Sequence, residues 1–259
     1  MPRYRLDIEY EGTRYRGWQV QPDVRTVQGE ILKALQDFLQ QTPVEFKGAG
    51  RTDAGVHALA QTAHLEIKRR VPPLQLTHEI NDRLPSDINI LRVQPAPPKF
   101  HARHDAVRRS YLYQIARRRT AFGKRFVWWL KDKLDTVPMH EAATLFHGMH
   151  DMRSFTAVRE GETRVRIEEV KLVEAGALLL IRLQASHFLW KMVRQMVGVL
   201  VEVGRGRLSV ADVRRFLREL SNAPAEFTAP PSGLFLEHTW YPGESPESSV
   251  QPTFSLPWD

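Results

Sequence analysis

Several short stretches of the chain place apolar side chains at every second position, the pattern of a strand with one buried face. The clearest stretch is residues 3–10, where Tyr4, Leu6, Ile8 and Tyr10 alternate with charged residues. The same alternation predicts strands at residues 63–67, 88–93 and 106–116, and a hairpin of strands at 165–173 and 177–185 with its turn at 174–176. The chain should therefore contain at least six strands.

Apolar residues spaced three and four apart predict helices in other stretches. The first predicted helix begins after Thr26, whose hydroxyl can cap it, and ends before Pro43. Its apolar stripe consists of Val27, Ile31, Leu35 and Phe38. A second predicted helix lies around Met139 to Phe146.

Two further helices are predicted near the end of the chain. The more apolar one runs from Phe188 to Val203 and stops at Gly204. Its stripe consists of Phe188, Met192, Met196, Val199 and Val203. Ser209 and Asp212 have the spacing of a capping box at the start of the last helix, whose apolar residues are Val213, Phe216, Leu217 and Leu220.

Strands and helices are mixed along the whole chain, which predicts an α+β fold. The proline-rich segment at 93–99 predicts a connector between two halves, residues 1–98 and 99–241. Residues 242–259 contain four prolines, three acidic residues and no basic residue, so we expect this tail to be extended and poorly ordered.

Composition limits the possible classes of protein. The 259 residues are 42% hydrophobic and 26% charged, which is ordinary globular usage. The sequence contains no cysteine, which excludes disulfides, thiolate nucleophiles and cysteine-ligated metal centres. The first residues have no apolar stretch typical of a secretory signal, and we expect a cytoplasmic protein.

The charge distribution favours a polyanionic partner. Lys and Arg number 37 against 30 Asp and Glu, for a net charge of +7 and a pI of about 9.8. Residues 99–125 hold nine basic residues and one acidic residue, so this stretch alone carries +8. Aromatic residues interrupt it at Phe100, Tyr111, Tyr113 and Phe122. Cations that bind phosphates, mixed with rings that stack on bases, are typical of an RNA surface, although a solvated basic face is the alternative.

Motifs for nucleotide chemistry are missing from the sequence, since it contains neither a Walker motif nor GxGxxG. The pairs His101 with His104 and His147 with His150 have HxxH spacing. Without a third clustered ligand, we expect these histidines to form hydrogen bonds rather than to bind a metal.

Two features suggest a reactive site. The loop GRTDAGVHA at 50–58 has glycines on either side of Asp53, so the backbone can turn sharply and present one carboxylate, unless Asp53 only bonds its own turn. Arg194 lies in the apolar segment FLWKMVRQMVG. An arginine there must reach solvent or meet a carboxylate, because an unpaired buried guanidinium is costly.

Seven segments together resemble one family. They are YEGTRYRGWQVQP, GAGRTDAGVHA, NDRLPSDI, FHARHDAVRRSYLY, HDMRSF, FLWKMVRQMVG and APPSGLFL, and they occur in that order over residues 4–241. The chain in this respect resembles the tRNA pseudouridine synthase A (TruA) family. The resemblance implies the pseudouridine synthase fold, with two similar halves, mostly antiparallel sheets and flanking helices around a basic central cleft.

The resemblance also implies an activity, the isomerisation of uridine to pseudouridine at positions 38, 39 and 40 of the tRNA anticodon stem-loop, without a cofactor or an essential metal. By position in the motifs, Asp53 would be the catalytic nucleophile and Arg194 its ionic partner. Tyr111 would stack on the target base and take part in proton transfer at C5, although a core tyrosine is the alternative. Whether Asp53 attacks C1′, attacks a base carbon or acts by elimination stays open.

RNA contacts follow from the same resemblance. A base in a stem must leave the stack before it can react, and Arg51 would fill the vacated space. The predicted phosphate contacts are Arg103, Arg108, Arg109, Arg117, Arg118 and Arg119. Leu234 and Leu236 would line the uracil pocket, unless they are plain core residues. The family works as a homodimer on tRNA. A non-catalytic RNA-binding or chaperone module of the same fold, and a synthase for another RNA, are the alternatives.

Overall fold

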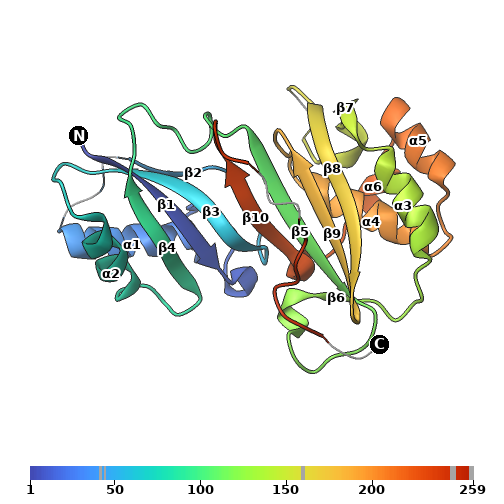
Figure 1. Ribbon diagram of the computed structural model, residues 1–259, viewed down its shortest axis with the longest axis horizontal. Helices are drawn as coiled ribbons and strands as arrows, with labels where there is room; N and C mark the ends of the chain where they lie inside the picture. Colours follow the sequence, from blue (N-terminus) through green and yellow to red (C-terminus); the bar gives the residue numbers. More distant parts are fainter. Residues whose placement is uncertain (41–42, 44, 159–160, 246–248, 257–259) are drawn as a thin grey trace. The chain divides into compact units, whose positions relative to one another are not determined.

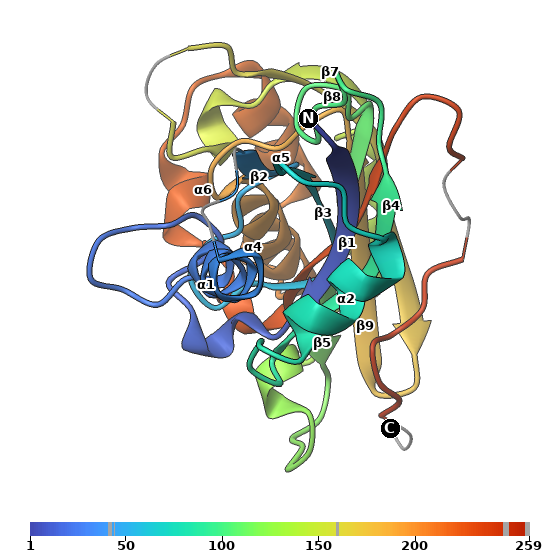
Figure 2. The ribbon, with the colours of Figure 1, turned by 90° about the vertical axis from the view of Figure 1, so that its left-hand side faces the viewer.

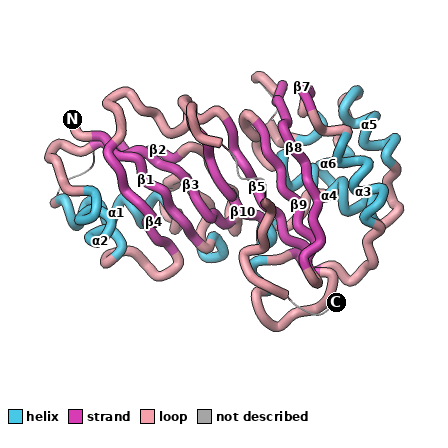
Figure 3. Tube along the Cα trace, viewed as in Figure 1, coloured by secondary structure: helices cyan, strands magenta, loops and turns pink. Residues whose placement is uncertain are grey.

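The computed structural model describes residues 1–40, 43, 45–158, 161–245 and 249–256 (Figure 1). The chain forms two compact units. Unit 1 comprises Met1–Val107 with Phe235–Ser245, and unit 2 comprises Arg108–Leu234 with Pro246–Asp259. Each unit combines a mostly antiparallel sheet with helices, which confirms the predicted α+β class (Figure 3).

The sheet of unit 1 has the order β4-β1-β3-β10, with β2 also paired to β3. Its strands are β1 (Arg3–Tyr10), β2 (Glu45–Gly48), β3 (His57–Glu66), β4 (Ile88–Pro95) and β10 (Leu234–Trp240). All its pairs are antiparallel except β10 with β3, which is parallel. The predicted strands at 3–10 and 88–93 are confirmed as β1 and β4, whereas the strand predicted at 63–67 overlaps only the end of β3, which already begins at His57.

Two helices accompany this sheet, and they lie beside one another next to β1 in Figure 2. Helix α1 (Val27–Leu39) begins as predicted, since the Thr26 hydroxyl accepts the Gly29 amide at 3.2 Å. It ends before Pro43 is reached, because Gln40 takes a left-handed conformation. Helix α2 (Pro73–Asn81) was not predicted from the sequence, since it is short and buries only Leu76 and Ile80.

The sheet of unit 2 has the order β5-β9-β8-β7, and β6 pairs in parallel with β5. Its strands are β5 (Arg108–Ala116), β6 (Trp128–Trp129), β7 (Gly148–Asp151), β8 (Arg164–Ala175) and β9 (Leu178–Ala185). The predicted hairpin is confirmed as β8 and β9, which pair antiparallel. Every residue of β9 is buried, so this strand is the centre of the unit.

Helices of unit 2 gather on one side of strands β7 to β9 (Figures 1 and 3). They are α3 (Thr136–Thr144), α4 (Met192–Gly204), α5 (Val210–Arg218) and α6 (Ala223–Glu226). The part of the chain that the structure describes also holds four short 3₁₀ turns, η1 (Gly12–Arg14), η2 (Lys124–Phe126), η3 (Arg153–Phe155) and η4 (Pro231–Gly233). Among the described residues, no helix combines the length and apolarity that crossing a membrane requires.

Helix α4 corrects one prediction. It begins at Met192 rather than Phe188, because Lys191 adopts a left-handed conformation with φ of 61° and interrupts the helical path. Helix α5 has the predicted capping box between Ser209 and Asp212. Leu220, predicted to be part of its apolar stripe, lies beyond the helix and is 66% exposed.

Part of the C-terminal segment is attached to unit 2. Gln114 donates to the Thr253 hydroxyl and accepts the Thr253 amide, both at 2.8 Å. The Leu256 carbonyl accepts the Ala177 amide at 3.1 Å, and the side chains of Val250 and Leu256 are buried. These contacts hold residues of a tail that its composition predicts to be poorly ordered.

Candidate functional site

The loop that carries Asp53 leads from β2 into β3 and is fixed by hydrogen bonds to the segment after β1. The Thr52 carbonyl accepts the Trp18 amide at 3.1 Å, and the Thr52 hydroxyl bonds the Tyr10 hydroxyl at 2.8 Å. The Gly55 amide donates to the Tyr15 carbonyl at 3.3 Å. The predicted turn around Asp53 is thus held on both sides.

Two glycines allow this close approach. A Cβ at Gly12 would lie 1.9 Å from the Val56 carbonyl oxygen, and one at Gly17 would lie 2.5 Å from the Thr52 carbonyl oxygen. Gly17 also has a φ of +93°, which other residues rarely adopt. Backbone therefore rests directly on backbone, and the loop has little freedom to shift.

Within the loop, the Val56 amide donates to the Asp53 carbonyl at 3.2 Å and closes the turn. Asp53 is half-buried and Arg51 is exposed. The loop thus presents a carboxylate and, two residues before it, a cation on a rigid turn.

Arg194 lies in the first turn of α4 and is half-buried. Its Nε donates to the Ala229 carbonyl at 2.7 Å, and its own carbonyl accepts the Ala229 amide at 3.0 Å. Gly198, one turn further on, lets the chain at Phe227 lie directly on the helix. The guanidinium is therefore held in one orientation by a segment packed against α4.

Tyr113 binds the same segment as Arg194. Its hydroxyl donates to the Pro230 carbonyl at 2.7 Å, next to the carbonyl that Arg194 binds. Burial raises the pKa of Tyr113 well above its ordinary value, while the Arg194 charge acts in the opposite direction. The tyrosine is therefore a neutral donor with a structural role.

Tyr111 lies two residues earlier on β5, opposite Leu183 of β9. The residue is 9% exposed, and its ring meets that of Phe188 edge-to-face, with 5.0 Å between the ring centroids. Asp53 belongs to unit 1, whereas Tyr111 and Arg194 belong to unit 2. A shared site for the three residues stays a prediction.

The predicted phosphate contacts differ in their surroundings. Arg103 and Arg119 are exposed. Arg108 and Arg109 are half-buried on β5; Arg109 donates to the Ser186 carbonyl at 2.7 Å and Arg108 reaches the Gln184 side chain at 3.4 Å.

Arg117 is part of a structural pair. It donates to the Glu174 carboxylate and to the Gly176 carbonyl, both at 2.7 Å, and so attaches the end of β5 to the turn of the β8–β9 hairpin. The bond from Arg117 lowers the pKa of Glu174. Arg118, next to it, donates to the Arg119 carbonyl at 3.2 Å.

Leu234 and Leu236 are core residues of β10, 4% and 1% exposed. Leu236 lies opposite Ala58 of β3. The structure shows their packing, and their role in a uracil pocket stays a prediction.

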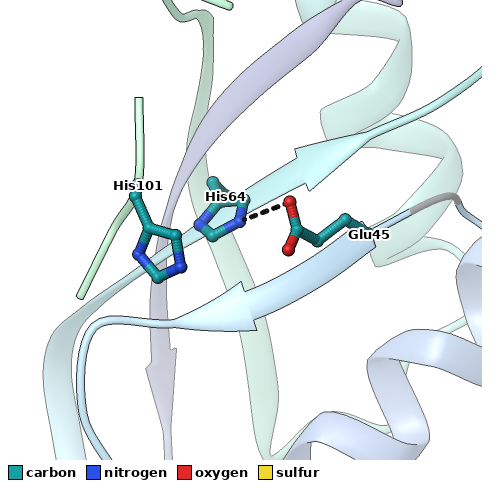
Figure 4. A group of neighbouring side chains, drawn as sticks. All are labelled: Glu45, His64 and His101. Carbon is teal, nitrogen blue, oxygen red and sulfur yellow. Dashed lines mark ion pairs between the residues drawn. The ribbon is translucent and has the colours of Figure 1, made fainter. Parts of the chain in front are cut away.

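A group that the sequence did not indicate consists of Glu45, His64 and His101, whose candidate ligand atoms lie within 4.8 Å of one another (Figure 4). His64 Nε2 is 3.2 Å from a Glu45 carboxylate oxygen. No spacing in the sequence connects the three residues, since only the pairing of β2 with β3 brings Glu45 towards His64. The predicted pair His101 and His104 also makes contact, with ring centroids 4.2 Å apart.

A family model described as tRNA pseudouridine synthase matches residues 8–105 and 142–242. The chain belongs to the tRNA pseudouridine synthase family. The matched ranges include Asp53, Arg103 and Arg194, whereas Tyr111 lies between them.

Relatives in the family are similar over nearly their whole length. A tRNA pseudouridine synthase A of Beijerinckia indica is 39% identical, with 98% of this chain and 99% of the relative covered. Those of Mesorhizobium japonicum and Aquifex aeolicus are 40% and 39% identical, with 93% and 92% of this chain and 100% and 98% of the relatives covered.

Proposed function

We propose that this protein converts uridine to pseudouridine at positions 38, 39 and 40 of the tRNA anticodon stem-loop. Its membership of the family supports the reaction class. The observation that carries the proposal is the loop of Asp53, which glycine contacts and backbone hydrogen bonds hold rigid within the matched range.

The reaction is an isomerisation, so it consumes no co-reactant. The bond between ribose C1′ and uracil N1 breaks, the base turns, and C1′ bonds C5. C5 loses its proton and N1 gains one. Asp53 supplies an ionised carboxylate, whether it attacks C1′ or a base carbon or acts by elimination.

Arg194 supports this carboxylate in the proposal. A nearby guanidinium stabilises an ionised acid in a desolvated site, where burial alone would favour the neutral form. The bond from Arg194 Nε to the Ala229 carbonyl orients the guanidinium before substrate binds. Tyr111, braced by Phe188, stacks on the uracil and takes part in proton transfer at C5.

The basic residues bind the anticodon arm. Arg51 fills the space that the flipped base leaves, and phosphates are bound by Arg103, Arg108, Arg109, Arg118 and Arg119. Arg117 contributes mainly through its bonds to the turn of the β8–β9 hairpin. Leu234 and Leu236 line the apolar side of the uracil pocket, and the protein acts as a homodimer.

Mapping of pseudouridine in tRNA transcripts tests this function. After reaction, carbodiimide modification and primer extension should report pseudouridine at positions 38, 39 and 40, and none after reaction with Asp53→Asn. Asp23→Asn is the matched control, because Asp23 is exposed and its positive φ suits asparagine. Product at other positions would contradict the proposed specificity, and tRNA binding without product would favour a non-catalytic module.

A further inference from the structure

Ala102, next to Arg103, is held at both of its backbone polar groups. Its amide donates to His64 Nδ1 at 3.1 Å, and its carbonyl accepts the Tyr241 hydroxyl at 2.7 Å. His64 and Ala102 are 0% exposed, and Tyr241 is 5% exposed. His64 of β3 and Tyr241, the residue after β10, therefore hold this point of the chain from two sides. We call this pair of side chains the clamp.

The turn that follows the clamp is closed by its own hydrogen bonds. The Asp105 carboxylate accepts the His101 amide at 2.9 Å, and the Asp105 amide donates to the His101 carbonyl at 3.0 Å. His101 Nδ1 accepts the Arg103 and His104 amides at 3.2 and 3.3 Å. Arg103 is exposed within this turn, as are His104 and Asp105.

His64 and His101 resemble a metal site together with Glu45 (Figure 4), but the hydrogen bonds of the two rings oppose metal binding. Nδ1 of both His64 and His101 accepts backbone amides, so each neutral ring carries its proton on Nε2. A metal at Nε2 would require that proton to leave or to move to Nδ1, where it would oppose an amide N–H. Buried His64 is neutral at pH 7, because desolvation lowers its pKa.

The Nε2 proton instead faces Glu45. His64 Nε2 lies 3.2 Å from a Glu45 carboxylate oxygen, a contact that is electrostatic rather than a well-directed hydrogen bond. Arg3 and Lys47 bind the same carboxylate at 2.9 and 2.5 Å, and hydrogen bonds, with that from Lys47 first, lower the pKa of Glu45 to about 2. Glu45 is thus an anion at neutral pH, and its charge favours a proton on Nε2, the tautomer in which Nδ1 accepts the Ala102 amide.

We infer that His64 and Tyr241 are positioning residues for tRNA binding, which act by holding the Arg103 turn. The inference rests on the proposed phosphate contact of Arg103. A turn that is already ordered loses less conformational freedom when it binds a phosphate. The clamp should therefore affect tRNA affinity and leave the chemical step at saturating tRNA unchanged.

Three variants test the clamp. His64→Leu removes the acceptor, His64→Asn keeps an acceptor near the Nδ1 position, and Tyr241→Phe removes one hydroxyl without changing the shape of the ring. Each is measured for tRNA Kd, KM and kcat, alone and combined with Arg103→Ala. Tyr241→Phe provides a second test should His64→Leu fold poorly.

If the clamp orders the Arg103 turn, His64→Leu and Tyr241→Phe should each raise the Kd and KM for tRNA by about fivefold, the effect of one lost hydrogen bond. We expect kcat within about twofold of wild type and His64→Asn close to wild type. In the Arg103→Ala background, none of the three should weaken binding further.

Other results would overturn the inference. Additive losses in the Arg103→Ala background would show that His64 and Tyr241 act elsewhere, while the role of Arg103 would stand. Arg103→Ala with wild-type affinity would instead contradict the phosphate contact itself. Zn²⁺ that raises the Tm of wild type but not of His64→Asn would establish a metal site and contradict the tautomer assignment.

Discussion

Gly198→Ala should destabilise unit 2, because the added Cβ would prevent the segment that orients Arg194 from packing against α4. A Cβ at Gly198 would lie 1.6 Å from the Phe227 carbonyl oxygen and 2.6 Å from its carbon. To reach even 3.0 Å, the segment must retreat by about 1.4 Å. The obstacle is backbone, so no side-chain rotation can relieve it.

The size of the effect follows from three contributions. Overpacking a tight contact costs about 1–3 kcal/mol. Retreat of the segment also weakens the two hydrogen bonds between Arg194 and Ala229, worth about 1 kcal/mol each. Alanine favours a helix over glycine by about 1 kcal/mol, which offsets part of the loss. The net expectation is a destabilisation of about 2–4 kcal/mol.

Urea unfolding followed by circular dichroism measures this change, as a lower midpoint at a constant slope. Gly50→Ala is the control, because a Cβ at Gly50 meets no atom within 4 Å, and it should unfold like wild type or slightly later. Gly198→Ala should also lower kcat while it retains tRNA binding. Equal stability of Gly198→Ala and Gly50→Ala would refute the close contact on α4 and the account of how Arg194 is oriented.

Three further changes have defined outcomes. Gly17→Ala should abolish pseudouridine formation while circular dichroism stays close to wild type, since its Cβ would displace Thr52 next to Asp53; retained activity would argue against a rigid loop. Burial lowers the pKa of His64, so below about pH 6.5 the unfolded chain binds more protons than the folded chain. The unfolding free energy should therefore fall from pH 7 to 5, by at most about 1.4 kcal/mol per pH unit for this group. His64→Asn should show a shallower slope, and equal slopes would contradict His64 as the origin. Arg117→Ala should change tRNA Kd by less than about twofold and lower stability by less than about 1 kcal/mol, and a large loss of affinity on filter binding would restore Arg117 as a phosphate contact.

Local patterns predicted the elements whose signal lies within a few residues. Alternation along 3–10 identified β1, and the Ser209 and Asp212 pair identified the start of α5. Helix α4 was predicted to begin four residues too early, because an apolar residue at 188 fits the stripe while the left-handed conformation of Lys191 leaves no signal in the apolar pattern.

Long-range contacts could not be predicted in this way. The parallel pairing of β10 with β3 joins residues about 180 positions apart, and the contact of His64 with Ala102 depends on the path of the chain after β4. The motifs indicated Asp53 and Arg194, but the structure was needed to show that glycine contacts hold the Asp53 loop and that Ala229 orients Arg194.

The most direct test of the proposed function is the release of tritium from tRNA transcribed with uridine labelled with tritium at C5. Formation of the new bond at C5 expels that hydrogen, so wild type should release tritium in proportion to product, and Asp53→Asn should bind the same tRNA and release none. Wild type that binds several such transcripts without release would contradict catalysis, and release by Asp53→Asn at the wild-type rate would contradict the role of Asp53.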